Sequence, residues 1–364
     1  MLRKGTFILM KTKIQDMTSG SPGRLIILFA IPLMLGNICQ QLYTMVDTMV
    51  VGQVAGVEAL AALGAVDFLM WVVTGISTGL TQGFSIQLSQ YYGAKDFENL
   101  RKSLAHSYRL TAFIAAGVLI LSQSFASLVL TGLHTPSNII GMSLLYLRII
   151  FCGIPATAAY NMFASALRAM GNSKTPLTAM IIASVLNVSL DILFVAGFGW
   201  GVAGAAIATV IAQSFSAVYC FLILRRIDIV HLTRADFMPA SGMNARLMKL
   251  GIPVVFQNII IGVGGLVVQY VINGYGFLFV AGFTATNKLY GLLEMAAISY
   301  GYAIVTYVGQ NLGAGKIDRI RKGVRSSMLL SLLTSLIISA AMFLFGKNIL
   351  SLFISGEPQQ TQQV

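Results

Sequence analysis

Long apolar runs, each about as long as a bilayer is thick, constrain this chain more than any other feature. Four of them carry no Asp, Glu, Lys or Arg, and they cover 68–94, 111–131, 149–167 and 326–346. Roughly 20 apolar residues are needed for a helix to cross a bilayer. Charged residues make up only 10% of the 364 positions, whereas a soluble domain needs about 25% to form its hydrated surface. The sequence therefore predicts an all-α polytopic membrane protein.

Nine spans are expected. The stretches 192–224 and 250–287 each contain two of them, because glycine-rich turns at 197–201 and 274–276 interrupt the apolar run. The nine expected spans cover 25–54, 59–90, 108–131, 139–165, 176–197, 202–225, 246–273, 278–312 and 325–354.

Basic residues gather in the N-terminal tail and in alternate loops, which together hold 21 of the 24 Lys and Arg residues. Cytoplasmic loops are enriched in Lys and Arg, so we expect a cytoplasmic N-terminus and a place in the inner or plasma membrane. Nucleic-acid binding is the other interpretation of a net charge of +12, but it requires a basic face on a soluble domain. The sequence offers no such domain, so nucleic acid is not expected as a partner.

The chain repeats itself at a shift of about 220 residues. The matched pairs include Gln90 with Gln310, Gly93 with Gly313, Arg101 with Arg321 and, with one residue of slack, Pro32 with Pro253. Six spans separate equivalent positions, and because six is even, both copies face the same way. This is the parallel-repeat plan of transporters, which places a binding site between the two halves.

The second copy stops after three spans, so we interpret the sequence as nine of the twelve helices of a truncated or frame-shifted protein. The expected organisation is a cytoplasmic tail (1–23), a six-helix N-terminal lobe (24–226), a cytoplasmic linker (227–245), a partial C-terminal lobe with helices seven to nine (246–355) and an aberrant tail (356–364).

Acidic residues inside apolar spans are costly to insert and indicate function. Asp47 shares a helix face with Tyr43 and Gln40, which precede it by four and seven residues. Pro32 lies earlier on the same span, where a proline is expected to kink or loosen the helix. Asp67 and Glu294 also lie within spans, but no polar stripe surrounds either of them.

A second group of polar residues lies on the fifth and sixth spans. Asn187 and Asp191 share a helix face, and Thr209 lies at a similar depth across the glycine-rich turn. Together with Asp47, their oxygens suit a hard cation such as Na⁺, or one carboxyl takes up a proton instead. The alternative is structural: the acids pair with Arg148 or Lys288, which we expect to be buried bases, and hold helices together.

These motifs resemble those of the multidrug and toxic compound extrusion (MATE) family. The resemblance rests on YTMVDTMVVG (43–52), NVSLDILF (187–194), GWGVAGAAIAT (199–209) and VGQNLGAGK (308–316). It covers about residues 20 to 355, and the motifs occur in the same order as in the family. It implies a two-lobe helical bundle that opens alternately to each side of the membrane.

The resemblance also implies a function: efflux of organic cations or amphipathic toxins by antiport with Na⁺ or H⁺. In the branch similar to the DNA-damage-inducible type, the cation site is in the first lobe. Matched residue by residue, that site comprises Asp47, Asn187, Asp191 and Thr209, with Gln40 and Tyr43 lining the cavity and Pro32 as the bending point. The protein is expected to act as a monomer in the lipid bilayer, with no cofactor other than the coupling ion.

Three other functions were weighed. A lipid-linked oligosaccharide flippase of the same superfamily should line its cavity with several basic residues, but the first lobe has only Arg148. An intramembrane enzyme should carry a motif such as His-Glu-x-x-His, which does not occur. The pattern Gly-x-Ser-x-Gly occurs at 75–79, but inside an apolar span and not at the strand-to-helix turn that its chemistry requires. An inactive truncated fragment is the third alternative.

Overall fold

The computed structural model describes residues 14–133, 135–273 and 277–350, apart from some side chains within the helices. All regular elements in these ranges are helices, which confirms the predicted all-α membrane fold. They are α1 (Pro22–Val54), α2 (Val57–Gly64), α3 (Asp67–Gly93), α4 (Phe97–Gly132), α5 (Ile140–Cys152), α6 (Ile154–Ala169), α7 (Lys174–Asp191), the π-helix η1 (Ile192–Gly197), α8 (Gly201–Leu224), the short 3₁₀-helices η2 (Asp228–Val230) and η3 (Arg234–Phe237), α9 (Met243–Asn273), α10 (Phe277–Gly313) and α11 (Ile317–Leu350).

Six helices among the described residues are long and apolar enough to cross a membrane, and eight if each of two bent pairs counts as one span. The span expected at 139–165 is such a pair, because α5 and α6 meet at 46° around Gly153. Pro155 contributes to this break, since it has no backbone N–H and fits only the first turn of α6. The span expected at 278–312 coincides with α10, but many α10 side chains lie outside the described residues.

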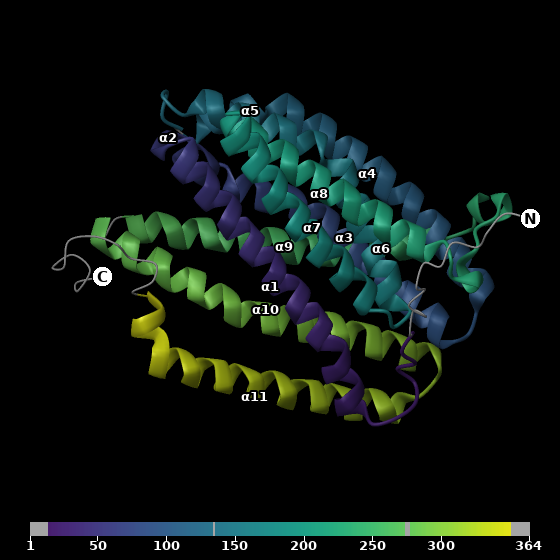
Figure 1. Cartoon of the computed structure of the whole chain (residues 1–364). Helices are drawn as coiled ribbons and strands as arrows, with labels where there is room; N and C mark the ends of the chain where they lie inside the picture. The colour runs from purple at the N-terminus through teal and green to yellow at the C-terminus, as the bar shows by residue number, and fades with distance from the viewer. Residues whose placement is uncertain (1–13, 134, 274–276, 351–364) are drawn as a thin grey trace, which may run out of the picture.

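The helices form two groups that are joined along their length. In Figure 1, α2–α8 form the upper group, α10 and α11 lie along the lower side, and α1 runs across both. The turns α3–α4 and α10–α11 lie at the end where the chain begins, on the right of Figure 1, together with the linker between α8 and α9. This end carries most of the loop Lys and Arg residues, and we call it the basic end.

α3 and α9 approach each other closely along their backbones. A Cβ atom at Gly79 would lie 2.9 Å from the backbone nitrogen of Val255, and one at Gly83 would overlap the backbone of Gly251. Only glycine allows two helix backbones to approach so closely, and small residues serve this purpose in membrane interfaces, where packing replaces the hydrophobic effect.

The internal repeat predicted from the sequence is visible in the helix boundaries. α3 ends at Gly93 and α10 at Gly313, which are matched residues of the repeat. Asn37 on α1 donates to the Ser299 hydroxyl on α10 at 3.1 Å. Asn258, five residues after Pro253 as Asn37 is after Pro32, donates to the Gly75 carbonyl on α3, also at 3.1 Å. Equivalent amides therefore connect the two halves of the protein on both sides.

α1 is one helix of 33 residues that includes Pro32, so the predicted bending point lies inside a continuous helix and not at a break between two. A proline removes one backbone hydrogen bond, and the packing of the neighbouring helices holds this part of α1 in place: Phe29, Ala30 and Leu33 are buried against Tyr300 and Ala303 of α10.

The glycine contact between α3 and α9 generates a stability prediction. Gly83→Ala should lower the apparent melting temperature of the detergent-solubilised protein, because overpacking a close contact costs about 1–3 kcal/mol. Gly117→Ala is the matched control, since a Cβ atom at this α4 position meets nothing within 4 Å. Equal melting temperatures for the two variants would contradict the close α3–α9 contact.

Candidate cation site

The two acids of the predicted site lie on different helices, and both are buried. Asp47 is on α1 and 6% exposed, whereas Asp191 is the last residue of α7 and 0% exposed. The two side chains are close enough for their charges to interact. The structure therefore brings together the two carboxylates that the sequence placed at a similar depth.

Asn187 and Thr209 complete the group. The Asn187 side chain is fully buried, and its amide nitrogen donates to the Thr209 hydroxyl oxygen at 3.4 Å, which connects α7 to α8. This hydrogen bond uses the amide nitrogen and leaves the amide oxygen unpaired. We refer to Asp47, Asn187, Asp191 and Thr209 as the carboxylate site.

Buried oxygen atoms without a hydrogen-bond partner gather in the carboxylate site and beside it. Ten buried side-chain oxygens have no partner among the described residues, and five of them lie here: Asp47 Oδ1, Asn187 Oδ1, Asp191 Oδ1 and Oδ2, and Gln213 Oε1. Buried polar atoms are normally paired, and an uncompensated buried carboxylate costs several kcal/mol. A group of acceptors that lacks donors is the chemical environment of a bound cation or an added proton.

The structural alternative to ion binding was pairing of the acids with Arg148 or Lys288. Arg148 is exposed on α5 rather than buried, so this expectation was wrong. α5 turns its Tyr146 and Leu147 inward and leaves the neighbouring arginine outside. The ion pairs found among the described residues are Arg101–Asp236 and Lys102–Glu98, both away from the carboxylate site. The Lys288 side chain lies outside the described residues.

The two predicted cavity-lining residues lie one and two turns before Asp47 on α1. The Tyr43 hydroxyl accepts a hydrogen bond from the Gln213 amide at 3.4 Å and also contacts Gln40. Sequence reasoning missed Gln213, although it follows Thr209 by four residues and therefore shares its helix face. It also missed Tyr146 of α5, which is 6% exposed and close to Asp47, Asp191 and Tyr43. No pattern in the sequence indicates that Tyr146 lies here.

Local backbone structure positions Asp191. The α-helix α7 ends at this residue and continues as the π-helix η1, whose backbone hydrogen bonds join residues five apart rather than four. π-Helical turns are uncommon and occur often at functional sites.

Three other sequence candidates lie apart from the carboxylate site or at its edge. Pro32 precedes Asp47 by 15 residues on α1, roughly 22 Å along a helix, so it does not touch the carboxylates. Asp67, at the start of α3, is exposed but close enough to interact electrostatically with Asp47. Glu294 is half-buried on α10, in the other group of helices.

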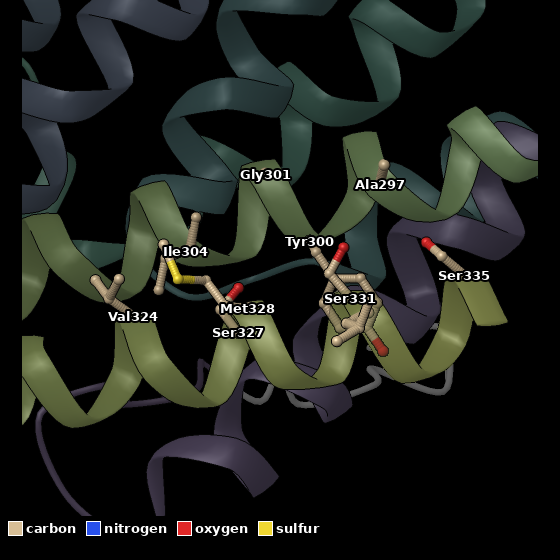
Figure 2. A pocket seen from close by; sticks show the side chains of 10 residues that line it. Ala297, Tyr300, Gly301, Ile304, Val324, Ser327, Met328, Ser331 and Ser335 are labelled. Carbon is tan, nitrogen blue, oxygen red and sulfur yellow. The ribbon is translucent and has the colours of Figure 1, made fainter.

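A groove of about 540 Å³ lies between α10 and α11, away from the acids. Figure 2 shows that it is bordered by Tyr300 and by Ser327, Ser331 and Ser335, which follow one another along α11. None of the ten residues that line it is charged. Because its lining is uncharged, this groove is not a candidate cation site despite its size. The buried acids remain the candidate.

Comparisons with known proteins agree with the family resemblance. The family model named MatE matches residues 32–193 and 253–359. The two matches begin at Pro32 and Pro253, which the internal repeat pairs. The probable multidrug resistance protein YpnP of Bacillus subtilis is 31% identical over 94% of this chain and 77% of its own length. The probable multidrug resistance protein NorM of Thermotoga maritima is 26% identical over 92% of this chain and 72% of its own length.

Solved structures share the fold. A MOP-superfamily transporter from Pyrococcus furiosus superimposes with a TM-score of 0.90 and 23% sequence identity. The superposition covers 97% of this chain and 78% of that one. At this level of identity, the likeness establishes the helix arrangement and leaves the residues of the site to be argued from this chain.

The unpaired oxygens generate a stability prediction. Addition of Na⁺, or acidification, should raise the melting temperature of the detergent-solubilised protein. At a cation concentration 100 times the dissociation constant, the free energy of unfolding should increase by about 2–3 kcal/mol. The double variant Asp47→Asn/Asp191→Asn should lose this response, because neutral amides do not need a cation. Asp228→Asn, the same change at an exposed linker residue, should keep it. A response that persists in the double variant would show that the cation binds elsewhere.

Proposed function

Because this chain belongs to the MATE family, a family of transporters rather than enzymes, we propose that it exports organic cations or amphipathic toxins in exchange for Na⁺ or H⁺ that enters through the carboxylate site. Its relatives are named as multidrug resistance proteins, and multidrug efflux is the function that the family membership supports. The chain spans 77% of the length of YpnP.

The observation that carries the proposal is the set of buried oxygens around Asp47 and Asp191 that have no donor in the described part of the chain. A coupling ion needs a site whose empty, charged state is unfavourable and whose filled state is less so, because the binding of the ion then changes the free energy of the surrounding helices. Two buried acids with no basic partner among the described residues meet this requirement. No further cofactor takes part in this scheme.

Competition between charges supplies the exchange. When the carboxylate site is empty, its negative charge favours the binding of a cationic cargo beside α1, where Gln40 and Tyr43 offer polar contacts. When an ion from outside binds there, it offsets one of the two negative charges of Asp47 and Asp191, so that attraction weakens and the cargo leaves on the outer side. By linkage, the cargo must lower the affinity for the ion by the same factor.

The proposed setting is the inner or plasma membrane, with the basic end and the N-terminus in the cytoplasm. The family and the apolar helices establish a multi-pass membrane protein. The orientation is supported by the Lys and Arg residues of the basic end, which follow the positive-inside rule. We propose that one copy of the chain forms the transport unit, because both the carboxylate site and its neighbours come from a single chain.

Transport of a lipid-linked oligosaccharide is the second candidate in the same superfamily, but no observation favours it. Such a cargo carries phosphate groups and requires basic residues in the cavity. The carboxylate site is acidic, and Arg148 is exposed rather than directed toward it. Cationic cargo is therefore the better match to the charge of this lobe.

Substitution of the acids tests the site. Asp47→Asn and Asp191→Asn should each abolish dye efflux while the protein still inserts into the membrane, because an amide cannot exchange a charge with the cargo. Asp228→Asn should transport like wild type. Efflux is measured as ethidium movement in inside-out vesicles, and protein amount by immunoblot. Wild-type dye tolerance in cells carrying both acid variants would refute the assignment.

An imposed ion gradient tests the mechanism. Inside-out vesicles should accumulate dye when a Na⁺ or H⁺ gradient is imposed across their membrane, because antiport takes its energy from the gradient. Dye accumulation should stop when an ionophore collapses the gradient. An enzyme would act without a gradient, and an inactive fragment would move no dye under either condition.

A further inference from the structure

A short segment before α1 crosses the basic end of the protein. Residues 14–20, which we call the strap, lie between the end of α6 in the first group of helices and the ends of α10 and α11 in the second. The strap uses mainly backbone groups, so its contacts do not depend on the identity of most of its side chains. This segment plays no part in the carboxylate site.

One end of the strap is fixed to the turn after α6. The Gln15 amide donates to the Gly171 carbonyl at 3.1 Å. Gly171 has a φ of +89°, and a Cβ atom there would overlap the Gln15 carbonyl. Both conditions require glycine, so the turn after α6 is shaped to receive the strap.

Gln310 at the end of α10 connects the strap to both groups of helices. Its side-chain oxygen accepts from the Met17 amide at 3.0 Å, and its side-chain nitrogen donates to the Ala169 carbonyl of α6 at 2.8 Å. Gln310 and Met17 are both 0% exposed. One buried amide therefore joins the strap, α6 and α10, and none of its partners has water to replace it.

The rest of the strap is held by residues around the α10–α11 turn. The Asn311 amide donates to the Met17 carbonyl, the Lys316 ammonium to the Thr18 carbonyl and Arg319 to the Gly20 carbonyl, each at 2.9 Å. The Asp16 carboxylate stabilises the turn of the strap itself, because it accepts from the Thr18 amide at 2.8 Å and from the Ser19 hydroxyl at 3.0 Å.

The pKa of Asp16 agrees with this arrangement. Partial burial alone would raise it, but the hydrogen bonds from Thr18 and Ser19 and the charge of Lys316 bring it below its ordinary value. Asp16 is therefore ionised at neutral pH, as its role as an acceptor requires.

Beneath the strap, residues that match in the internal repeat meet one another. A Cβ atom at Gly93 would overlap the Gln310 carbonyl, and one at Gly313 would overlap the Gln90 carbonyl. Gly309 faces Ser89, its own counterpart in the repeat. The pseudo-twofold axis therefore passes through this contact, and the helix ends at the basic end can separate only by breaking it.

We propose that Gln310 and the strap form the gate that closes the transport pathway on the basic side, and that they must release before cargo can enter from that side. This inference rests on the proposed antiport function. Gln310 has a positioning role in the transport cycle, because its side chain fixes the strap and α6 without touching the cargo.

A disulfide across the gate tests the proposal. A Cβ atom at Gly23 of α1 would lie 3.8 Å from the Cβ of Ser326 on α11, which is the usual spacing in a disulfide. In Gly23→Cys/Ser326→Cys, oxidation should stop dye transport almost completely, and reductant should restore it. Each single variant, with the same native cysteines, should transport under both conditions.

The outcomes separate the gate from the antiport function. If the oxidised double variant transports like the reduced one while mass spectrometry shows the disulfide, this side does not open and the gate proposal is wrong. If the reduced double variant, both single variants and the wild-type protein all move no dye, the proposed antiport function has failed instead.

A second measurement follows the gate without relying on transport. Ser89 is fully buried beneath the strap, so Ser89→Cys should react slowly with a membrane-impermeant maleimide added from the basic side. Addition of Gln310→Ala should speed this labelling about tenfold or more, since the Met17 amide and the Ala169 carbonyl then lose a buried partner.

Gln90→Ala is the matched control for this measurement. Gln90 is the repeat counterpart of Gln310, but its side chain makes no hydrogen bond among the described residues, so its loss should leave the labelling rate unchanged. Equal rates in the Gln310→Ala and Gln90→Ala backgrounds would overturn the positioning role of Gln310.

Discussion

Negative charge that is buried with no basic partner among the described residues is the constraint around which the first group of helices is organised. Asp191 is fully buried and Asp47 nearly so, and the described residues around them offer no donors to their unpaired oxygens. Such an arrangement would be selected against in a purely structural core, where paired or apolar residues pack at lower cost. Its persistence is explained if a cation or proton regularly occupies the site, so that the energy of the empty state is used to drive a change in the helices.

α1 is the element that connects this charge to the rest of the protein. It begins at Pro22, directly after the strap, packs against α10 through Phe29 and Leu33, and carries Asp47 in its last third. One helix therefore reaches from the gate at the basic end to the carboxylate site. In the proposed cycle, neutralisation of Asp47 alters the packing of α1 against α7 and α8, and the resulting movement acts on the strap through the same helix. The amides of Asn37 and Asn258 connect the two halves between these ends.

Sequence reasoning reached the helical membrane fold, the family and the repeat, because apolar length and motif order determine them locally. It brought Asp47 and Asp191 together by depth, since rise per residue is fixed in a helix. It could not predict the exposed position of Arg148, because an apolar span does not indicate which face meets the bundle. Tyr146 was missed for the same reason. The break at Gly153 was missed because, in a sequence, a proline near the start of a helix looks like a proline inside a span. The strap depends on backbone groups, which leave no signature in side-chain patterns.

Direct measurement of ion binding tests the central claim most closely. Purified protein in detergent can be titrated with ²²Na⁺ at alkaline pH, and with acid in a pH-stat, to count the Na⁺ ions and protons bound per chain. The account predicts one saturable cation, Na⁺ or H⁺, that is lost in both Asp47→Asn and Asp191→Asn and retained in Asp228→Asn. Binding of the same stoichiometry and affinity in all three variants would contradict it.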